Sequence, residues 1–134
     1  MTSMAKLCVA IYADGIAYKH WSLFVDGPTD NDKFIFHIMG SSTRYRFEMR
    51  KSDANKSASL VELIKLCDVD FSKIGIIQQA AENAVIHNEY PGYNCQDYVL
   101  ELLGDLENQG CVDGKDPSYK KQKQLAKSKQ EGFS

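Results

Sequence analysis

The chain has 134 residues and a mass of 15.1 kDa, which is the size of one domain. Hydrophobic residues make up 43% and charged residues 25%, so the composition excludes a chain that is disordered throughout. The net charge of −2 argues against a nucleic-acid-binding protein, whose usual mark is a basic domain. No apolar run approaches the ~18–20 residues of a membrane span, and Lys6 and Asp14 interrupt any N-terminal signal sequence. We therefore expect a cytoplasmic protein whose four scattered cysteines are reduced thiols.

The first half of the chain has the pattern of short strands. Apolar runs rich in β-forming residues occupy Leu7–Ala13, His20–Val25 and Lys33–Met39, and turn residues follow each of them. Tyr45–Arg50 alternates apolar and polar residues, as in an antiparallel strand with one wet face. Four strands at this spacing predict an antiparallel meander.

The pattern then changes to a helical period. Ser59 and Glu62 have capping-box spacing, which predicts a helix that continues to Cys67. Residues 73–77 fit either a fifth strand or the start of a helix, and residues 78–87 fit a helix. The clearest helix spans Asn94–Asn108. The predicted class is α+β, with four to five strands packed against helices.

The C-terminal part differs from the rest in charge. Residues 115–134 hold six lysines against Asp116 and Glu131, a net charge of +4 that leaves −6 for the rest of the chain. Asp116-Pro117 is a typical helix start, but few large apolar residues follow it. We therefore divide the chain into a single domain, residues 1–112, and a Lys-rich, loosely packed helical tail, residues 113–134.

Cys95 is the first candidate for chemistry. Asn94 is a strong N-cap residue and Asp97 lies three positions later, so Cys95 falls at the first helical position. The unpaired N–H groups and the helix dipole at that position favour a thiolate, the form in which a cysteine is a nucleophile. Cys95 also lies on the apolar stripe of its helix, so an inert core cysteine is the alternative.

Two histidines could serve a cysteine nucleophile as base and orienting group. His20 begins one predicted strand and His37 lies inside the next, so the rings face one another if the hairpin register allows it. Each could instead be a satisfied core or rim side chain. His87 lies at the end of a predicted helix, where it would stabilise the dipole, and we assign it no chemistry.

Three short motifs resemble the lecithin–retinol acyltransferase-like proteins, members of the permuted branch of the NlpC-type, papain-like cysteine hydrolases. The family pattern is H-W-[AS]-[IL]-Y-V-G, then V-[IV]-H-L, then N-C-E-H-F-V at a helix start. The matching segments are His20-Trp21-Ser22-Leu23-Phe24-Val25 with Gly27, then Ile35-Phe36-His37-Ile38, and finally Asn94-Cys95-Gln96-Asp97-Tyr98-Val99. The resemblance implies a permuted papain-like fold over residues 1–112.

The resemblance also implies roles for three residues. His20 matches the general base, His37 the group that orients it, and Cys95 the nucleophile. The implied activity is a thiol hydrolase or acyltransferase that attacks an ester, thioester, amide or isopeptide carbonyl and forms an acyl-enzyme. The expected partner is a small-molecule or peptide/lipid acyl substrate, with no cofactor. A Lys-rich tail stands in place of the hydrophobic anchor found in the phospholipid-acting members.

Residues near these motifs are candidates for substrate contact, namely Tyr90, Tyr93, Trp21 and Asn94. A zinc site built from the two histidines, Cys95 and Asp97 is a further interpretation, although no ligand pair has zinc-site spacing. The alternative function is a catalytically inactive binding module of the same fold, which binds a partner through its basic tail or aromatic cleft. The sequence leaves the oligomeric state open.

Overall fold

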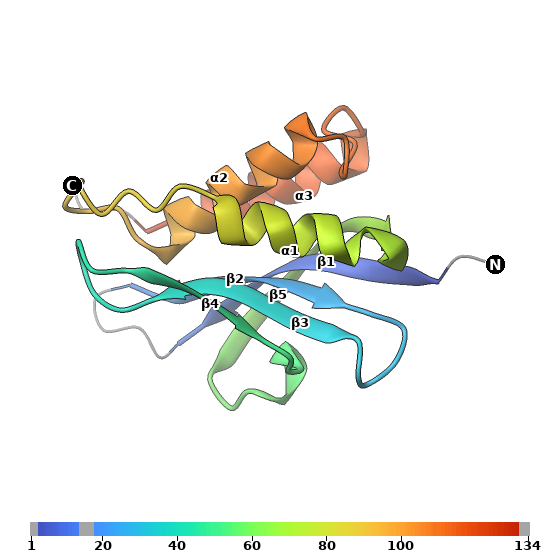
Figure 1. Cartoon of the computed structure of the whole chain (residues 1–134), viewed down its shortest axis with the longest axis horizontal. Coiled ribbons are helices and arrows are strands. Elements are labelled where there is room, and N and C mark those ends of the chain that lie inside the picture. Colours follow the sequence, from blue (N-terminus) through green and yellow to red (C-terminus); the bar gives the residue numbers. More distant parts are fainter. Residues whose placement is uncertain (1–2, 14–17, 132–134) are drawn as a thin grey trace.

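A five-stranded antiparallel sheet carries three helices on one face (Figure 1). The computed structural model describes residues 3–13 and 18–131. The strands are β1 (Met4–Tyr12), β2 (His20–Asp26), β3 (Lys33–Met39), β4 (Arg46–Arg50) and β5 (Leu60–Asp70). The helices are α1 (Ile74–Asn83), α2 (Cys95–Asn108) and α3 (Pro117–Ser128), and the short 3₁₀ turns are η1 (Ala54–Lys56) and η2 (Phe71–Lys73).

The strand order is β4-β3-β2-β1-β5, and every neighbouring pair is antiparallel. Strands β1 to β4 form a meander, and β5 returns to pair with the other edge of β1. The predicted class and the predicted meander are therefore confirmed. Residues 94–108 also behave as expected: α2 begins at Cys95, and Asn94 caps it in a complete capping box with Asp97.

The segment after Ser59 is a strand, and the prediction of a helix there was wrong. β5 pairs with β1 along its whole length, and the register shifts twice, at Leu66 and Val61. Each shift adds a residue to β5, so the apolar residues lose strict alternation and fall at spacings that resemble a helix. Pairing with β1 outweighs the local capping signal, and the carbonyl of Ser59 instead accepts the N–H of Ala13 over 2.8 Å.

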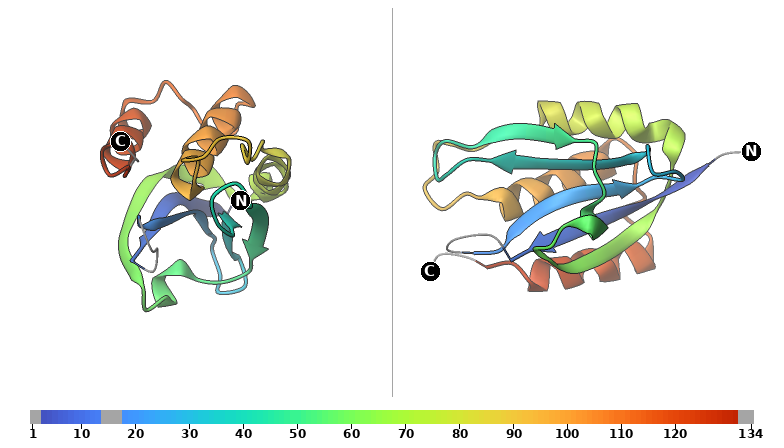
Figure 2. Two further views of the ribbon diagram at one scale, coloured as in Figure 1. Left: turned by 90° about the vertical axis from the view of Figure 1, so that its left-hand side faces the viewer. Right: turned by 90° about the horizontal axis from the view of Figure 1, so that it is seen from below.

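Side chains on the two faces of the sheet form two clusters. The larger cluster lies under the helices and joins the β2 and β3 residues Trp21, Leu23 and Phe36 to the α2 residues Tyr98 and Leu102. The smaller cluster lies on the opposite face, toward which the sheet curves (Figure 2), and its members are Cys8, Ala10, Tyr12, Phe24, Ile35 and Ala54. Because side chains alternate along a strand, His37 shares the face of Ile35, away from the helices.

Helix α3 packs more closely than the expected loose tail. Tyr119 is 1% exposed and Ala126 is fully buried, so α3 presents an apolar stripe to β5. The Tyr119 hydroxyl donates to Glu107 over 2.6 Å, and Gln122 Nε2 donates to the Lys65 carbonyl over 3.0 Å. One aromatic ring and one alanine are enough to pack α3 against the sheet, because the charged ends of the neighbouring lysines remain in water.

If α3 belongs to the folded unit, Tyr119→Ala will lower the free energy of unfolding by about 3 kcal/mol, since it removes a buried ring and leaves a cavity. Lys120→Ala is the control, because Lys120 is exposed on the same helix, and its effect should stay within about 0.5 kcal/mol. Urea denaturation followed by tryptophan fluorescence measures both. Equal stability of the two variants would mean that α3 is a dispensable tail.

Candidate functional site

The candidate site lies where β2 and β3 part. Within the described residues, their pairing runs from Asp26↔Lys33 to Leu23↔Phe36 and ends there. β2 nevertheless remains paired with β1 as far as His20, and β3 remains paired with β4 as far as Met39. The two halves of the sheet therefore separate at this end, which is also the end where α2 begins (Figure 1).

The thiol of Cys95 reaches the peptide groups on both sides of His20. The N–H of Trp21 donates to Cys95 Sγ over 3.4 Å, and the thiol faces the Lys19 carbonyl at 4.0 Å. The capping box fixes this position, because Asn94 Oδ1 accepts the N–H of Gln96 over 2.8 Å and sets the direction in which the first turn starts. A cysteine of the helix thus bonds to a backbone donor at the opening between the strands.

The two histidines predicted to act with Cys95 lie together, and a carboxylate extends them into a chain of hydrogen-bonded side chains. His20 Nε2 is 2.8 Å from His37 Nδ1, and His37 Nε2 is 2.8 Å from Glu48 Oε1. Pairing of β3 with β4 places Glu48 directly opposite His37. Glu48 was not among the residues predicted from the sequence, although the alternation of Tyr45–Arg50 and the short β3–β4 connection could have indicated an acidic residue across from His37.

The hydrogen bonds of this chain fix the positions of the ring protons when both rings are neutral. A carboxylate only accepts, so His37 Nε2 carries the proton that Glu48 binds. His37 Nδ1 is then an acceptor, and His20 Nε2 donates to it. In this tautomer His20 is unprotonated at Nδ1, the ring nitrogen closest to its backbone, and the two peptide groups of that backbone contact the thiol.

Glu48 is held in its charged form. The hydrogen bond from His37 lowers the pKa of the Glu48 carboxyl, and the Arg50 side chain, which donates from Nε to Oε1 over 2.6 Å, lowers it further. Both donors use the same oxygen, Oε1. The far end of the chain is therefore an anion at neutral pH, able to stabilise positive charge on the two rings.

Burial outweighs the helix start in setting the charge of Cys95. The residue is 2% exposed, and this desolvation raises the pKa of the thiol from its ordinary value of 9.0 to about 11. Hydrogen bonds from backbone N–H groups, with that of Trp21 the strongest, act in the opposite direction and only partly compensate. The expected thiolate at the helix start is therefore not the resting form, and a reaction at Cys95 needs a base.

The N–H groups of the first turn of α2 differ in availability. The Asn94 N–H donates to Asp97 Oδ2 over 3.0 Å, and that of Gln96 donates to Asn94 Oδ1. The N–H of Cys95 is outside this cap network. Of these three N–H groups, that of Cys95 is therefore the one that the cap does not engage.

The four residues expected to touch substrate have different positions. Trp21 is fully buried and Tyr93 is 7% exposed, so both rings belong to the core rather than to an open surface. The Asn94 side chain is buried in the cap. Tyr90 is 61% exposed and is the member of the set that a substrate could reach in this conformation.

Hydrogen bonds of Tyr45 connect three segments near the site: the residues before β2, the β3–β4 connection and the loop that precedes Cys95. The hydroxyl groups of Tyr18 and Tyr45 share a hydrogen bond, and burial raises the pKa of both, so both stay neutral. Asn88 binds the Tyr45 backbone twice, accepting its N–H over 2.8 Å and donating to its carbonyl over 2.9 Å. The loop is thereby tied to the β3–β4 connection beside the site.

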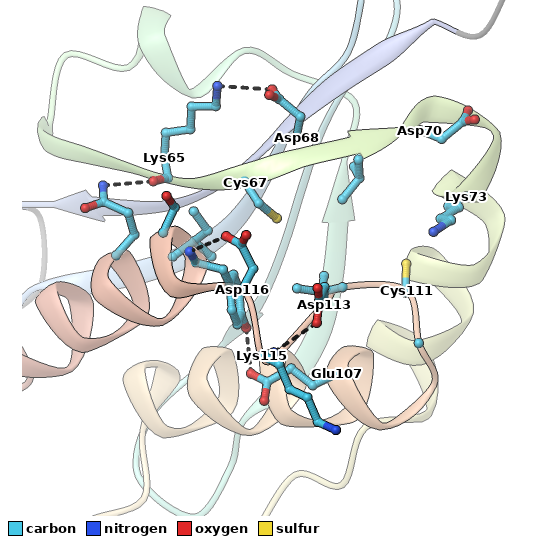
Figure 3. A pocket seen from close by; sticks show the side chains of 18 of the residues that line it. Lys65, Cys67, Asp68, Asp70, Lys73, Glu107, Cys111, Asp113, Lys115 and Asp116 are labelled. Carbon is cyan, nitrogen blue, oxygen red and sulfur yellow. Dashed lines mark hydrogen bonds and ion pairs between the residues drawn. The ribbon is translucent and has the colours of Figure 1, made fainter.

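A cavity away from this site also contains cysteines. It encloses about 1410 Å³ between β5, the end of α2 and the start of α3 (Figure 3). Cys67 and Cys111 line it, and burial raises the pKa of Cys67 to about 11. The charged groups around it are engaged locally: Asp113 accepts the Lys115 N–H, and Glu107 binds Tyr119 and Lys123. We therefore do not place chemistry there.

No set of three or more His, Cys, Asp and Glu side chains in ranges 3–13 and 18–131 is arranged to hold a metal ion. In the same ranges, every helix is too short or too polar to cross a membrane.

Comparison with known protein families matches residues 7–113 to one described as "Family of unknown function (DUF6540)". The chain belongs to this family. Neither the comparison with curated proteins nor that with solved structures gave a match. The matched range contains His20, His37, Glu48 and Cys95, and it ends before α3.

His87 lies in the loop after α1 and not at a helix end, because α1 already ends at Asn83. It forms ion pairs within this loop and with α2. Its Nδ1 lies 3.3 Å from Glu89 and its Nε2 lies 3.2 Å from Glu101 on α2. The hydrogen bond to Glu89, with the nearby charge of Glu101, raises the pKa of His87. The His87 side chain therefore ties the loop to α2.

His87 makes the stability of the fold depend on pH. Since the folded pKa of His87 lies above the unfolded value of about 6.5, its contribution to stability is complete below that value and is lost as pH rises through the folded pKa. The difference in free energy of unfolding between the wild type and His87→Gln should be larger at about pH 5.5 than at about pH 9. Urea titrations at the two pH values measure it, and a difference that grows with pH would contradict the link.

Proposed function

We propose that the protein is a cysteine-dependent acyl-transfer enzyme, a hydrolase or acyltransferase, in which Cys95 attacks an ester, thioester, amide or isopeptide carbonyl. His20 is the base, His37 orients it, and Glu48 holds the charge at the end of the chain. The observation that carries the proposal is the pair of 2.8 Å contacts, His20–His37 and His37–Glu48, beside a thiol bonded to the backbone on both sides of His20.

The base is required by the state of the thiol. With the pKa of Cys95 at about 11, only about one molecule in ten thousand carries a thiolate at neutral pH. Transfer of the thiol proton to His20 Nδ1 during the attack avoids the cost of forming a bare thiolate in a buried site. The resulting imidazolium donates to His37, and the Glu48 carboxylate stabilises the pair.

The remaining steps use the start of α2 and the same base. The sulfur forms a bond to the carbonyl carbon, and the oxyanion accepts the N–H of Cys95, a type of contact typically worth ~2.7–4 kcal/mol in the transition state. The imidazolium then protonates the leaving group, the tetrahedral adduct collapses, and an acyl-enzyme forms. Water or another acceptor, deprotonated by His20, attacks the thioester and releases the thiol.

The first test compares cysteines. We expect iodoacetamide at neutral pH to alkylate Cys95 faster than Cys111, which is also buried, because the Cys95 thiol contacts the backbone on both sides of His20, the proposed base, whereas Cys111 lines the cavity between β5, α2 and α3. Cys95→Ala should abolish the fast phase, His20→Ala should slow it about a hundred-fold, and Cys111→Ala should leave it unchanged. Peptide mapping by mass spectrometry gives the rates. Equal labelling of all four cysteines would remove the case for a special thiol.

Glu48→Gln tests the carboxylate end of the His20–His37–Glu48 hydrogen-bond chain. The substitution keeps the size of the side chain but removes its charge, so turnover of an activated nitrophenyl ester should fall about ten-fold to a hundred-fold with KM unchanged. Glu82→Gln, an exposed site on α1, is the matched control. A change in KM alone would point to a structural role for Glu48.

The second candidate is an inactive binding module, and the burial and raised pKa of Cys95 favour it. In that case the exposed lysines of α3, such as Lys120 and Lys121, would bind an acidic partner. The two functions differ in their dependence on Cys95 and on salt: partner binding would weaken with salt and persist in Cys95→Ala, whereas acyl transfer would not survive that substitution.

A further inference from the structure

The three residues after α3, Lys129–Glu131, form a short segment that we call the C-terminal strap. It crosses from the β5 edge to the start of α2. Lys129 Nζ lies 3.5 Å from Glu62 Oε1, Gln130 Nε2 donates to Asp97 Oδ1 over 2.9 Å, and the Glu131 N–H donates to Gln96 Oε1 over 2.7 Å.

Glu131 also contacts the start of β2 through its carboxylate. The Lys19 N–H donates to Glu131 Oε1 over 3.1 Å, and the Lys19 ammonium lies 3.5 Å from the same oxygen. Lys19 and Gln96 are in turn bonded to each other, because Gln96 Nε2 donates to the Lys19 carbonyl over 2.9 Å. That carbonyl is the one that faces the Cys95 thiol at 4.0 Å. Glu131 therefore closes a ring of bonds around the residues that flank the thiol.

The groups under the strap are those of a binding site for peptide. Gln96 is fully buried, and its Oε1 needs a donor that the peptide N–H of Glu131 supplies. Beside it, the N–H and ammonium of Lys19 bind a carboxylate. A peptide with an acidic residue offers the two groups that the strap supplies here, a peptide N–H and a carboxylate.

We propose that the C-terminal strap occupies in cis a binding site for an acidic peptide segment beside Cys95, and that the thiol becomes accessible when the strap is displaced. The statement about substrate class rests on the proposed function. A groove of about 310 Å³ adjoins the strap between the β1 and β5 residues Ile11, Val61 and Glu62, and gives a longer peptide room to continue.

The strap is held weakly enough to leave. The side chains of Lys19 and Glu131 are 51% and 40% exposed, so water and salt screen their attraction. Its contacts with the body of the protein are a few side-chain hydrogen bonds and ion pairs, the kind of segment that opens locally without global unfolding. The segment also lies outside the matched family range, which ends at residue 113.

The experiment uses the full chain with Glu131→Pro, which removes both the carboxylate and the N–H that Gln96 accepts. The rate of Cys95 alkylation by iodoacetamide should rise about ten-fold, the factor expected for the loss of one or two hydrogen bonds of typical net strength. Asp30→Ala, an exposed carboxylate at the opposite end of β2, should leave the rate unchanged. The thermal midpoint should be equal in both variants. An unchanged rate in Glu131→Pro would overturn the proposal.

A second arm tests the peptide site in trans. An acetylated peptide with the sequence of residues 127–134 should slow alkylation of the Glu131→Pro variant, and the same peptide with Gln for Glu should not. Protection by neither peptide, or equal protection by both, would overturn the acidic-peptide site.

Failure of this inference can be told from failure of the proposed function. If Glu131→Pro raises the rate but His20→Ala does not change it, the strap covers a thiol that lacks a base, and the acyl-transfer mechanism is wrong. If His20→Ala lowers the rate and Glu131→Pro has no effect, the mechanism stands and the strap proposal is wrong.

Discussion

The hydrogen bond from the Trp21 N–H to Cys95 Sγ is the interaction on which the arrangement of this site depends. In a continuous sheet, that N–H would be satisfied by a neighbouring strand. Here β2 and β3 stop pairing at Leu23, and the first residue of α2 supplies the acceptor. The contact fixes the start of the helix against the opening of the sheet, and it brings a thiol from one structural layer to the backbone of a histidine in another.

Two opposing effects act on this thiol, and their sizes decide its charge. A helix N-terminus favours an anion by about 0.3–1 kcal/mol, which is less than one pKa unit. The shift of Cys95 from 9.0 to about 11 corresponds to about 3 kcal/mol in favour of the neutral form. Burial therefore wins, and the position at the first helical turn is not enough to make a thiolate. For this reason, the proposed mechanism assigns His20 the transfer of a proton during the reaction rather than the holding of a preformed ion pair.

The elements that the sequence predicted correctly are those that depend on residues close together in the chain. The cap at Asn94 and the apolar stripe after it were sufficient for α2, and short β-rich runs between turns were sufficient for the meander. The prediction for β5 failed because two bulges gave the strand a helical spacing, and only the partner strand β1 reveals its register. Glu48 was missed for a related reason: its pairing with His37 is a property of the hairpin register. The burial of Trp21, Tyr93 and the thiol depends on how whole layers pack, which the sequence pattern does not specify.

The strap and the histidine–carboxylate chain come from different parts of the fold. Within the described residues, His20, His37 and Glu48 come from three adjacent strands, whereas Glu131 follows the last helix and lies over the first turn of α2. Bonds at strand pairings are hard to break singly, because each belongs to a cooperative ladder, while the bonds of a terminal segment open with little cost to the rest. The buried Gln96 amide links the terminal segment to the start of β2, since it bonds both Lys19 and Glu131, and Lys19 directly precedes His20.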